Sequence, residues 1–228
     1  MFKEQIEWIV EEKADFIVVE TMGHIGEALL ALEAVKQYGK GLEAVVTMAI
    51  YFEDQTFEGT DIVTAMQQLE AAGAAVVGLN CGRGPITMLP TMRKIRERVK
   101  IPIAALPVAY RTDTKSPTLH SLKDPESGER AFPMNLGPHS CSRDDIARFA
   151  MEARQIGIQY VGLCCGNCGH LTRTLAEMMG KSPPGSKYSP DMSDHFLFGK
   201  KSQAHNKQLI KQMSGTDLKH PEFVKEVI

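Results

Sequence analysis

The sequence has few cysteines, no long apolar run and no excess of charge of either sign. Its 26 Lys and Arg side chains nearly balance 28 Asp and Glu, so charge gives no reason to expect a nucleic acid or an anionic membrane as partner. No apolar run reaches the roughly 18–20 residues that span a bilayer. The N-terminal stretch MFKEQIEWIVEEK carries charges every few residues, unlike a secretory signal. We therefore expect a cytoplasmic protein with no nucleic-acid or membrane partner.

The cysteines are five in number, and three of them fall within the stretch VGLCCGNCGH at 161–170. Five is an odd number, two of the cysteines are adjacent, and a reducing compartment disfavours stable disulfides. A disulfide framework is therefore a poor explanation. Metal binding or thiol catalysis explains the cluster better.

Short apolar runs alternate with helix-like segments from Asp15 onward, which is the pattern of β-α units around a parallel sheet. The first 180 residues show no shift in composition, so we expect them to form one main domain. Five apolar runs predict strands, at 16–20, 44–49, 75–80, 101–106 and 158–163.

Apolar residues at helical spacing predict helices between these strands, over 25–35, 62–69 and 89–99. The next helix is expected to begin at Ser142, where SRDD resembles a capping box: the hydroxyl accepts a hydrogen bond from an early backbone N–H. The apolar stripes and the cap are structural features rather than sites.

Two regions interrupt this alternation. The polar, proline-bearing segment at 111–141 is longer than a connecting loop needs to be, which indicates an active-site cover or an insertion. After Lys181 the composition turns to Pro, Ser, Gly and Lys, followed by a polar segment whose Leu209, Ile210 and Met213 are compatible with one helix. We interpret residues 181–228 as an arm used in oligomerisation and expect a homo-oligomer.

Chemistry in a parallel α/β fold collects at the carboxyl ends of the strands. Glu20 ends the first predicted strand, Cys81 follows the third, and Cys164 and Cys165 follow the fifth. Three thiolates brought together at that edge would leave a tetrahedral zinc ion with its fourth position open, which is the arrangement of a catalytic site. The sequence thus predicts Zn²⁺ on these three cysteines.

Each residue also has a plainer explanation. A carboxylate at a strand end often caps a helix or forms a salt bridge, and a single buried cysteine often serves as a small apolar residue. A closed structural zinc site would need a fourth ligand, whereas Cys165 and Cys168 form a single C-x-x-C pair with no second pair. A redox pair of these two cysteines before a helix remains an alternative. His170 is expected to be a surface or capping residue, and Cys168 a small residue packed at the start of the last helix.

The segments DFIVVET at 15–21, GLNC at 78–81 and GLCCG at 162–166 resemble the homocysteine S-methyltransferase family, and most closely its betaine–homocysteine branch. The resemblance covers residues 1 to 180, with LPVAY at 106–110 in matching order. It implies a (β/α)₈ TIM-barrel type of fold, zinc on Cys81, Cys164 and Cys165, and binding of the homocysteine amino group by Glu20. Residues 1–180 would then be the C-terminal part of a homocysteine-binding barrel.

The sequence departs from the family pattern in three places. Thr21 stands where the betaine branch has an aromatic residue suited to a quaternary ammonium group, so the methyl donor is open between betaine and sulfonium compounds. The residues after CCG differ from the family, so no family role transfers to Cys168 or His170. The match starts about three β-α units into the family barrel, and five strands do not close an eight-stranded barrel. We therefore expect a fragment, a chain whose partner supplies the missing strands, or a degenerate relative.

Three functions follow from these residues. The first is a zinc-dependent S-methyltransferase, or its C-terminal part, that converts homocysteine to methionine. The second is a non-catalytic zinc-binding fragment or remnant of such an enzyme. The third is a thiol-redox protein that uses Cys165 and Cys168.

Overall fold

The computed structural model describes residues 1–189, which contain a single five-stranded parallel sheet. The strands are β1 (Phe16–Met22), β2 (Glu43–Met48), β3 (Val76–Asn80), β4 (Ile103–Leu106) and β5 (Tyr160–Val161), and they lie side by side in sequence order. The predicted β-α alternation and the parallel order are confirmed. The fifth strand is shorter than the sequence predicted.

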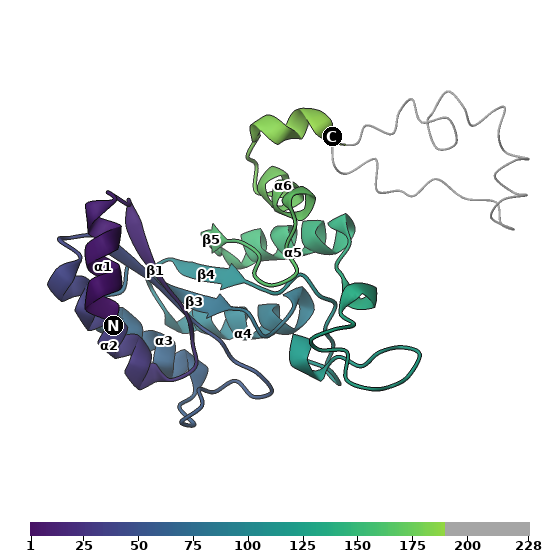
Figure 1. Cartoon of the computed structure of the whole chain (residues 1–228), viewed down its shortest axis with the longest axis horizontal. Coiled ribbons are helices and arrows are strands. Elements are labelled where there is room, and N and C mark those ends of the chain that lie inside the picture. Colours follow the sequence, from purple (N-terminus) through teal and green to yellow (C-terminus); the bar gives the residue numbers. More distant parts are fainter. Residues whose placement is uncertain (190–228) are drawn as a thin grey trace, which may run out of the picture. The chain divides into compact units, whose positions relative to one another are not determined.

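Within residues 1–189, four helices connect consecutive strands, and two more lie before β1 and after β5 (Figure 1). They are α1 (Phe2–Glu11), α2 (Ile25–Tyr38), α3 (Ile62–Ala71), α4 (Pro85–Arg98), α5 (Arg143–Ile156) and α6 (Gly169–Met178). Three short 3₁₀ helices also lie in the described part of the chain: η1 (Leu119–Ser121), η2 (Gly137–His139) and η3 (Pro184–Tyr188).

The start of α5 is fixed by the capping box that the sequence predicts. The Ser142 hydroxyl accepts a hydrogen bond from the Asp145 N–H at 3.2 Å, and the Asp145 carboxylate accepts one from the Ser142 N–H at 2.8 Å. The helix ends at Gly157, whose φ of 81° is the left-handed conformation in which glycine is favoured. Local sequence therefore sets both ends of this helix.

The sheet is curved, and its two faces differ. Ile17 and Val19 of β1 are buried against the helices, whereas Phe16 and Val18 point to the other, concave face and are 43% and 38% exposed. A flat sheet would hold its two outer strands about 19 Å apart. The rings of Phe16 in β1 and Tyr160 in β5 nevertheless meet edge to face, with centroids 6.4 Å apart. The five strands therefore curl as part of a barrel does.

The structure divides after Pro183. Residues Met1–Pro183 form one compact unit, and η3 belongs to a second unit that begins at Pro184. The arm predicted at 181–228, with its helix around Leu209, falls largely outside the described residues. Its role in oligomerisation stays a prediction.

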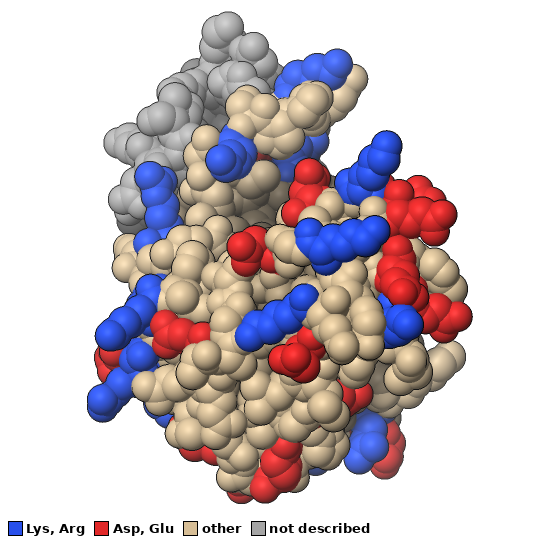
Figure 2. Space-filling model, turned by 90° about the vertical axis from the view of Figure 1, so that its left-hand side faces the viewer, with Lys and Arg blue, Asp and Glu red and all other residues tan. Residues whose placement is uncertain are grey.

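No helix within residues 1–189 is both long and apolar enough to cross a bilayer. On the face drawn in Figure 2, acidic and basic side chains are interspersed, without a broad region of one sign.

Candidate metal centre

The carboxyl ends of β3 and β5 bring three cysteines together. Cys81 directly follows β3, and Cys164 and Cys165 come three and four residues after β5. Their sulfur atoms all lie within 4.8 Å of one another, and the Sγ atoms of Cys81 and Cys165 are 3.7 Å apart. Strands that are distant in sequence thus deliver three sulfurs to one point, as the sequence predicted.

The end of β4, which lies between β3 and β5, holds both cysteine segments in place. The N–H of Cys81 donates to the Leu106 carbonyl at 3.0 Å, and the N–H of Cys164 donates to the Pro107 carbonyl at 2.8 Å. The Ala109 N–H in turn donates to the Cys165 carbonyl at 2.8 Å. The spacing of the three sulfurs is therefore set by backbone hydrogen bonds to residues 106–109.

The three thiols share their protons unequally. The hydrogen bond from Cys81 lowers the pKa of Cys164 to about 6, whereas the same hydrogen bond, together with burial, raises the pKa of Cys81 well above its usual range. Burial, and next the charge of Cys164, raise the pKa of Cys165. One thiolate therefore forms readily, and its two neighbours are held protonated around it unless a cation balances their charge.

Asn80, which precedes Cys81, is fully buried and links three strands. Its Oδ1 accepts hydrogen bonds from the Thr21 N–H and from the Thr47 hydroxyl, both at 2.8 Å. Its Nδ2 donates to the Thr21 hydroxyl at 2.7 Å. Asn80 ends an apolar strand in the sequence, but nothing in the sequence alone shows which strands it would join.

Glu20 lies at the same edge of the sheet, in an irregular part of β1. The register between β1 and β2 shifts between Val19 and Met22, and Thr21 has a φ of 62°. Such bulges redirect side chains at the ends of strands. The Glu20 side chain is exposed and has no hydrogen-bond or ion-pair partner among residues 1–189. The structure therefore ties Glu20 to the cysteines only indirectly, through Thr21 and Asn80.

The long segment between Arg111 and Cys141 packs against the cysteines. Leu119, Leu122 and Ala131 of this segment form an apolar cluster with Val108, and Cys81 and Cys164 pack on the same cluster. The segment also pairs with the β3–α4 loop, where the Leu119 N–H donates to the Gly82 carbonyl at 2.9 Å. The segment therefore packs beside Cys81 and Cys164, and its interpretation as an active-site cover or an insertion stays a prediction.

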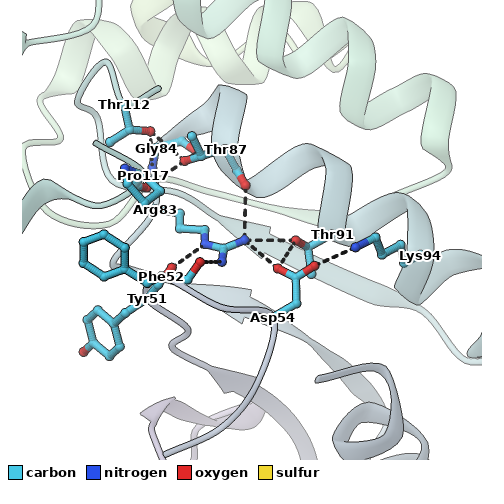
Figure 3. Close-up of polar contacts among 10 residues, drawn as sticks. All are labelled: Tyr51, Phe52, Asp54, Arg83, Gly84, Thr87, Thr91, Lys94, Thr112 and Pro117. Carbon is cyan, nitrogen blue, oxygen red and sulfur yellow. Dashed lines mark hydrogen bonds and ion pairs between the residues drawn. The ribbon is translucent and has the colours of Figure 1, made fainter. Parts of the chain in front are cut away.

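A buried arginine fixes the loop that carries Cys81 to the β2–α3 loop at 51–61 (Figure 3). The Arg83 guanidinium donates to the Tyr51 carbonyl at 2.8 Å, the Phe52 carbonyl at 3.1 Å and the Asp54 carboxylate at 2.7 Å. Its side chain is only 7% exposed. Burial alone raises the pKa of Asp54, but hydrogen bonds from Lys94, Thr91 and Arg83 outweigh it and lower that pKa. The sequence interpretation missed this pair because its members are 29 residues apart.

A glycine directly after the paired cysteines allows a close turn. Gly166 has a φ of 79°, and a Cβ atom there would lie 2.6 Å from the Tyr110 ring. Any other residue would be strained by the backbone and would collide with the ring. The turn that positions Cys165 therefore requires glycine.

Cys168 lies outside the group of three sulfurs. It is the N-cap residue of α6 and is exposed, with its Sγ 3.3 Å from Nδ1 of His170. Cys168 thus lies at the start of the last helix as predicted, but it is exposed to solvent and not packed. His170 is also exposed, in agreement with its predicted surface position.

The chain matches the family model described as homocysteine S-methyltransferase over residues 1–179. The chain belongs to this family. The match covers the whole sheet and all three clustered cysteines, so the resemblance found in the sequence motifs is confirmed.

Curated relatives include enzymes named for two different methyl donors. The chain is 31% identical to a betaine–homocysteine S-methyltransferase 1 of Rattus norvegicus, over 92% of this chain and 50% of that protein. It is 30% identical to an S-methylmethionine–homocysteine S-methyltransferase of Mus musculus, over 92% of this chain and 56% of that protein. The chain thus spans about half the length of these relatives, and identity does not choose between the donors.

The fold is similar to that of the homocysteine methyltransferase MmuM from Escherichia coli. The apo form of that protein superposes with a TM-score of 0.55 at 13% identity, over 78% of this chain and 56% of that chain. Its metallated form gives the same TM-score, over 79% of this chain and 51% of that chain. The described domain therefore corresponds to part of a TIM-barrel type fold.

Proposed function

We propose that this protein is a zinc-dependent S-methyltransferase, or the part of one that carries the metal centre, which transfers a methyl group from a betaine- or sulfonium-type donor to homocysteine to give methionine. The observation that carries the proposal is the cluster of Cys81, Cys164 and Cys165 at one edge of the sheet. Family membership supports homocysteine as the acceptor.

The spacing of the sulfurs suits zinc. Tetrahedral coordination with Zn–S bonds of about 2.3 Å places sulfur ligands about 3.8 Å apart. The Cys81–Cys165 distance of 3.7 Å agrees with this value, and all three sulfurs lie within 4.8 Å of one another. When bound, zinc supplies the positive charge that keeps all three cysteines and a fourth, substrate thiol deprotonated near neutral pH.

The remaining residues would orient the substrates and exclude water. Glu20 would bind the homocysteine amino group, because its carboxylate is exposed at the edge of the sheet and is not engaged by any residue among 1–189. Asn80 would keep the Glu20 strand in register with Cys81 through Thr21. The apolar cluster of the long segment would shield one side of the cysteines from solvent.

The reaction itself is a displacement at carbon. The homocysteine sulfur forms a bond to the methyl carbon while the bond from that carbon to nitrogen or sulfur breaks, and its electron pair stays on the leaving atom. A cationic donor becomes a neutral amine or sulfide, and the thiolate becomes the neutral thioether of methionine. No proton needs to move in this step, so alignment of the two substrates is the main requirement.

The test is to load purified protein with zinc and homocysteine and to offer betaine and S-methylmethionine separately, measuring methionine. Production of methionine from at least one donor, lost in Cys81→Ala and kept in Cys168→Ser, is the expected result. Folded protein that binds zinc but yields methionine from neither donor would contradict the catalytic function.

That outcome would favour the second candidate, a non-catalytic zinc-binding remnant. Its zinc would bind the same three clustered cysteines, Cys81, Cys164 and Cys165. The two functions share the metal centre and differ in turnover alone.

A further inference from the structure

Five aromatic side chains form a continuous row along the carboxyl ends of the strands. Neighbouring ring centroids are 5.2 Å apart for His24 and Phe57, 5.4 Å for Phe57 and Tyr51, 5.5 Å for Tyr51 and His120, and 4.5 Å for His120 and Phe132. The rings of Tyr51 and Phe57 are nearly parallel, at 6°. We call these five side chains the aromatic row.

The row comes from three separate loops, so the fold, not local sequence, assembles it. His24 follows β1, Tyr51 and Phe57 lie in the β2–α3 loop, and His120 and Phe132 belong to the long segment before α5. Phe57 is 63% exposed. A large exposed ring held in a stack is available for contact with a ligand.

One end of the row lies against the cysteines. Phe132 packs on the apolar cluster that also contacts Cys81 and Cys164. The Tyr51 ring would lie 3.6 Å from a Cβ atom on Gly82, the residue after Cys81. A ligand on Tyr51 would therefore lie beside the loop that carries Cys81.

The charge around the row suits a cation. The loop 51–61, YFEDQTFEGTD, contains no Lys or Arg and four carboxylates, of which Asp54 is paired with Arg83 and Lys94. Burial, and next the charge of Arg130, lower the pKa of His120, which favours the neutral form of this ring. Aromatic faces attract cations and bind methylated ammonium groups in particular.

The backbone at Tyr51 is held by the buried side chain of Arg83. The Tyr51 carbonyl accepts from Arg83 Nε, and in Figure 3 the ring points away from that guanidinium. Arg83 itself is paired with Asp54 and does not compete for a ligand at the ring. The aromatic surface is thus anchored to the same loop that carries Cys81.

We propose that the aromatic row, centred on Tyr51 and Phe57, binds the methylated onium group of the donor and takes the place of the aromatic residue that position 21 lacks. This inference rests on the proposed function for the identity of its ligand. The hydroxyl and the N–H of Thr21 are hydrogen-bonded to Asn80 and help to keep the strands in register. The contact with the onium group would instead come from the β2–α3 loop. Ammonium and sulfonium donors share this chemistry.

The test compares each cation with an uncharged molecule of the same shape. Isothermal titration calorimetry of the full-length chain would use tetramethylammonium, betaine and S-methylmethionine as probes, with 3,3-dimethylbutanoate as the neutral isostere of betaine. If the donor is betaine, we expect the isostere to bind about tenfold more weakly than betaine. If the donor is a sulfonium compound, we expect S-methylmethionine to bind and betaine not to bind. Equal binding of betaine and its isostere would show that the row recognises shape alone and would overturn the inference, as would no binding of any onium probe.

Two variants and two matched controls locate the binding. Tyr51→Leu and Phe57→Leu should each lower the affinity for the onium compound about tenfold. Tyr51→Phe keeps the ring and should change this affinity less than about twofold. Phe52→Leu removes an adjacent ring that is 67% exposed and should have no effect. Unchanged affinity in both Tyr51→Leu and Phe57→Leu would refute the inference. If Tyr51→Leu does not fold, the Phe57→Leu variant tests the inference by itself, because the Phe57 side chain is exposed.

Zinc content and methyl transfer, measured on the same samples, separate this inference from the proposed function. Onium binding that depends on Tyr51, without any methyl transfer, would leave the inference standing and refute the enzyme. Methyl transfer with the same donor affinity in wild type, Tyr51→Leu and Phe57→Leu would refute the inference and leave the enzyme standing.

Discussion

Asn80 and Thr21 are joined by two hydrogen bonds, from the Thr21 N–H to Asn80 Oδ1 at 2.8 Å and from Asn80 Nδ2 to the Thr21 hydroxyl at 2.7 Å. Thr21 follows Glu20, and Asn80 precedes Cys81. One buried amide therefore couples the proposed homocysteine-binding carboxylate to the first of the clustered cysteines.

Replacing Asn80 with Ala should destabilise the protein and loosen this coupling. The change leaves the Thr21 N–H and the Thr47 hydroxyl without their acceptor, at a cost of about 2–3 kcal/mol in the free energy of unfolding. Thr47→Val removes only one of the hydrogen bonds and should cost about 1 kcal/mol. Urea denaturation measures both losses in the free energy of unfolding, provided that the m-value is the same in wild type and variants. Equal losses in the two variants would show that Asn80 does not link the strands.

Removing the buried arginine should be far more harmful than removing an exposed one. Arg83→Met leaves two backbone carbonyls without their side-chain donor and removes one of the three side chains that donate to the Asp54 carboxylate, so a loss of about 3 kcal/mol is expected. Arg93→Met, in the same region of the chain, breaks an ion pair with Glu152 whose side chains are 49% and 46% exposed, and should cost less than about 1 kcal/mol. Similar unfolding midpoints for the two variants would contradict the role of Arg83.

Asp54 should make the protein sensitive to acid. Its pKa is lowered in the folded state, so its carboxylate stabilises the fold fully above the unfolded value of about 3.9, and this stabilisation is lost as the pH falls through the folded pKa. Wild type should therefore be more stable than Asp54→Asn at pH 7, and the difference should narrow from about pH 4 downward. A difference that stays constant to lower pH would show that the carboxylate is not stabilised in this way.

The turn after Cys165 should tolerate glycine only. Gly166→Ala adds both a strained φ and a clash with Tyr110, whereas Gly128→Ala adds a strained φ of 73° with nothing within 4 Å of the new Cβ. The control should cost about 1 kcal/mol, and Gly166→Ala should cost more and also weaken zinc binding. Zinc affinity measured by chelator competition distinguishes them, and an unaltered affinity in Gly166→Ala would show that the turn does not set the position of Cys165.

Much of the scaffold was predictable because it depends on local patterns. Apolar runs and helical spacing predicted the strands and helices, and the cap at Ser142 fixed the start of α5. The rule that chemistry collects at strand ends predicted that Cys81 would meet Cys164 and Cys165. These inferences need only periodicity and the direction of parallel strands.

The features that sequence reasoning missed depend on contacts between distant segments. The aromatic row assembles rings from three loops, Arg83 binds a loop about 30 residues earlier in the chain, and Asn80 joins three strands. Cys168 was expected to be packed, but the backbone placed it at an exposed helix cap. Such outcomes follow from loop conformation, which residue type alone does not determine.

Zinc content, measured on purified wild type and two cysteine variants, tests the metal centre most directly. We predict one zinc per chain in the wild type and in Cys168→Ser, and loss of zinc in Cys81→Ala, because Cys81 Sγ lies 3.7 Å from that of Cys165 while Cys168 lies outside the cluster. Each of the three clustered cysteines supplies a third of the protein's proposed ligands, so methyl transfer should fall together with zinc. Full zinc in Cys81→Ala with loss in Cys168→Ser would contradict the site and favour a centre built on Cys165 and Cys168.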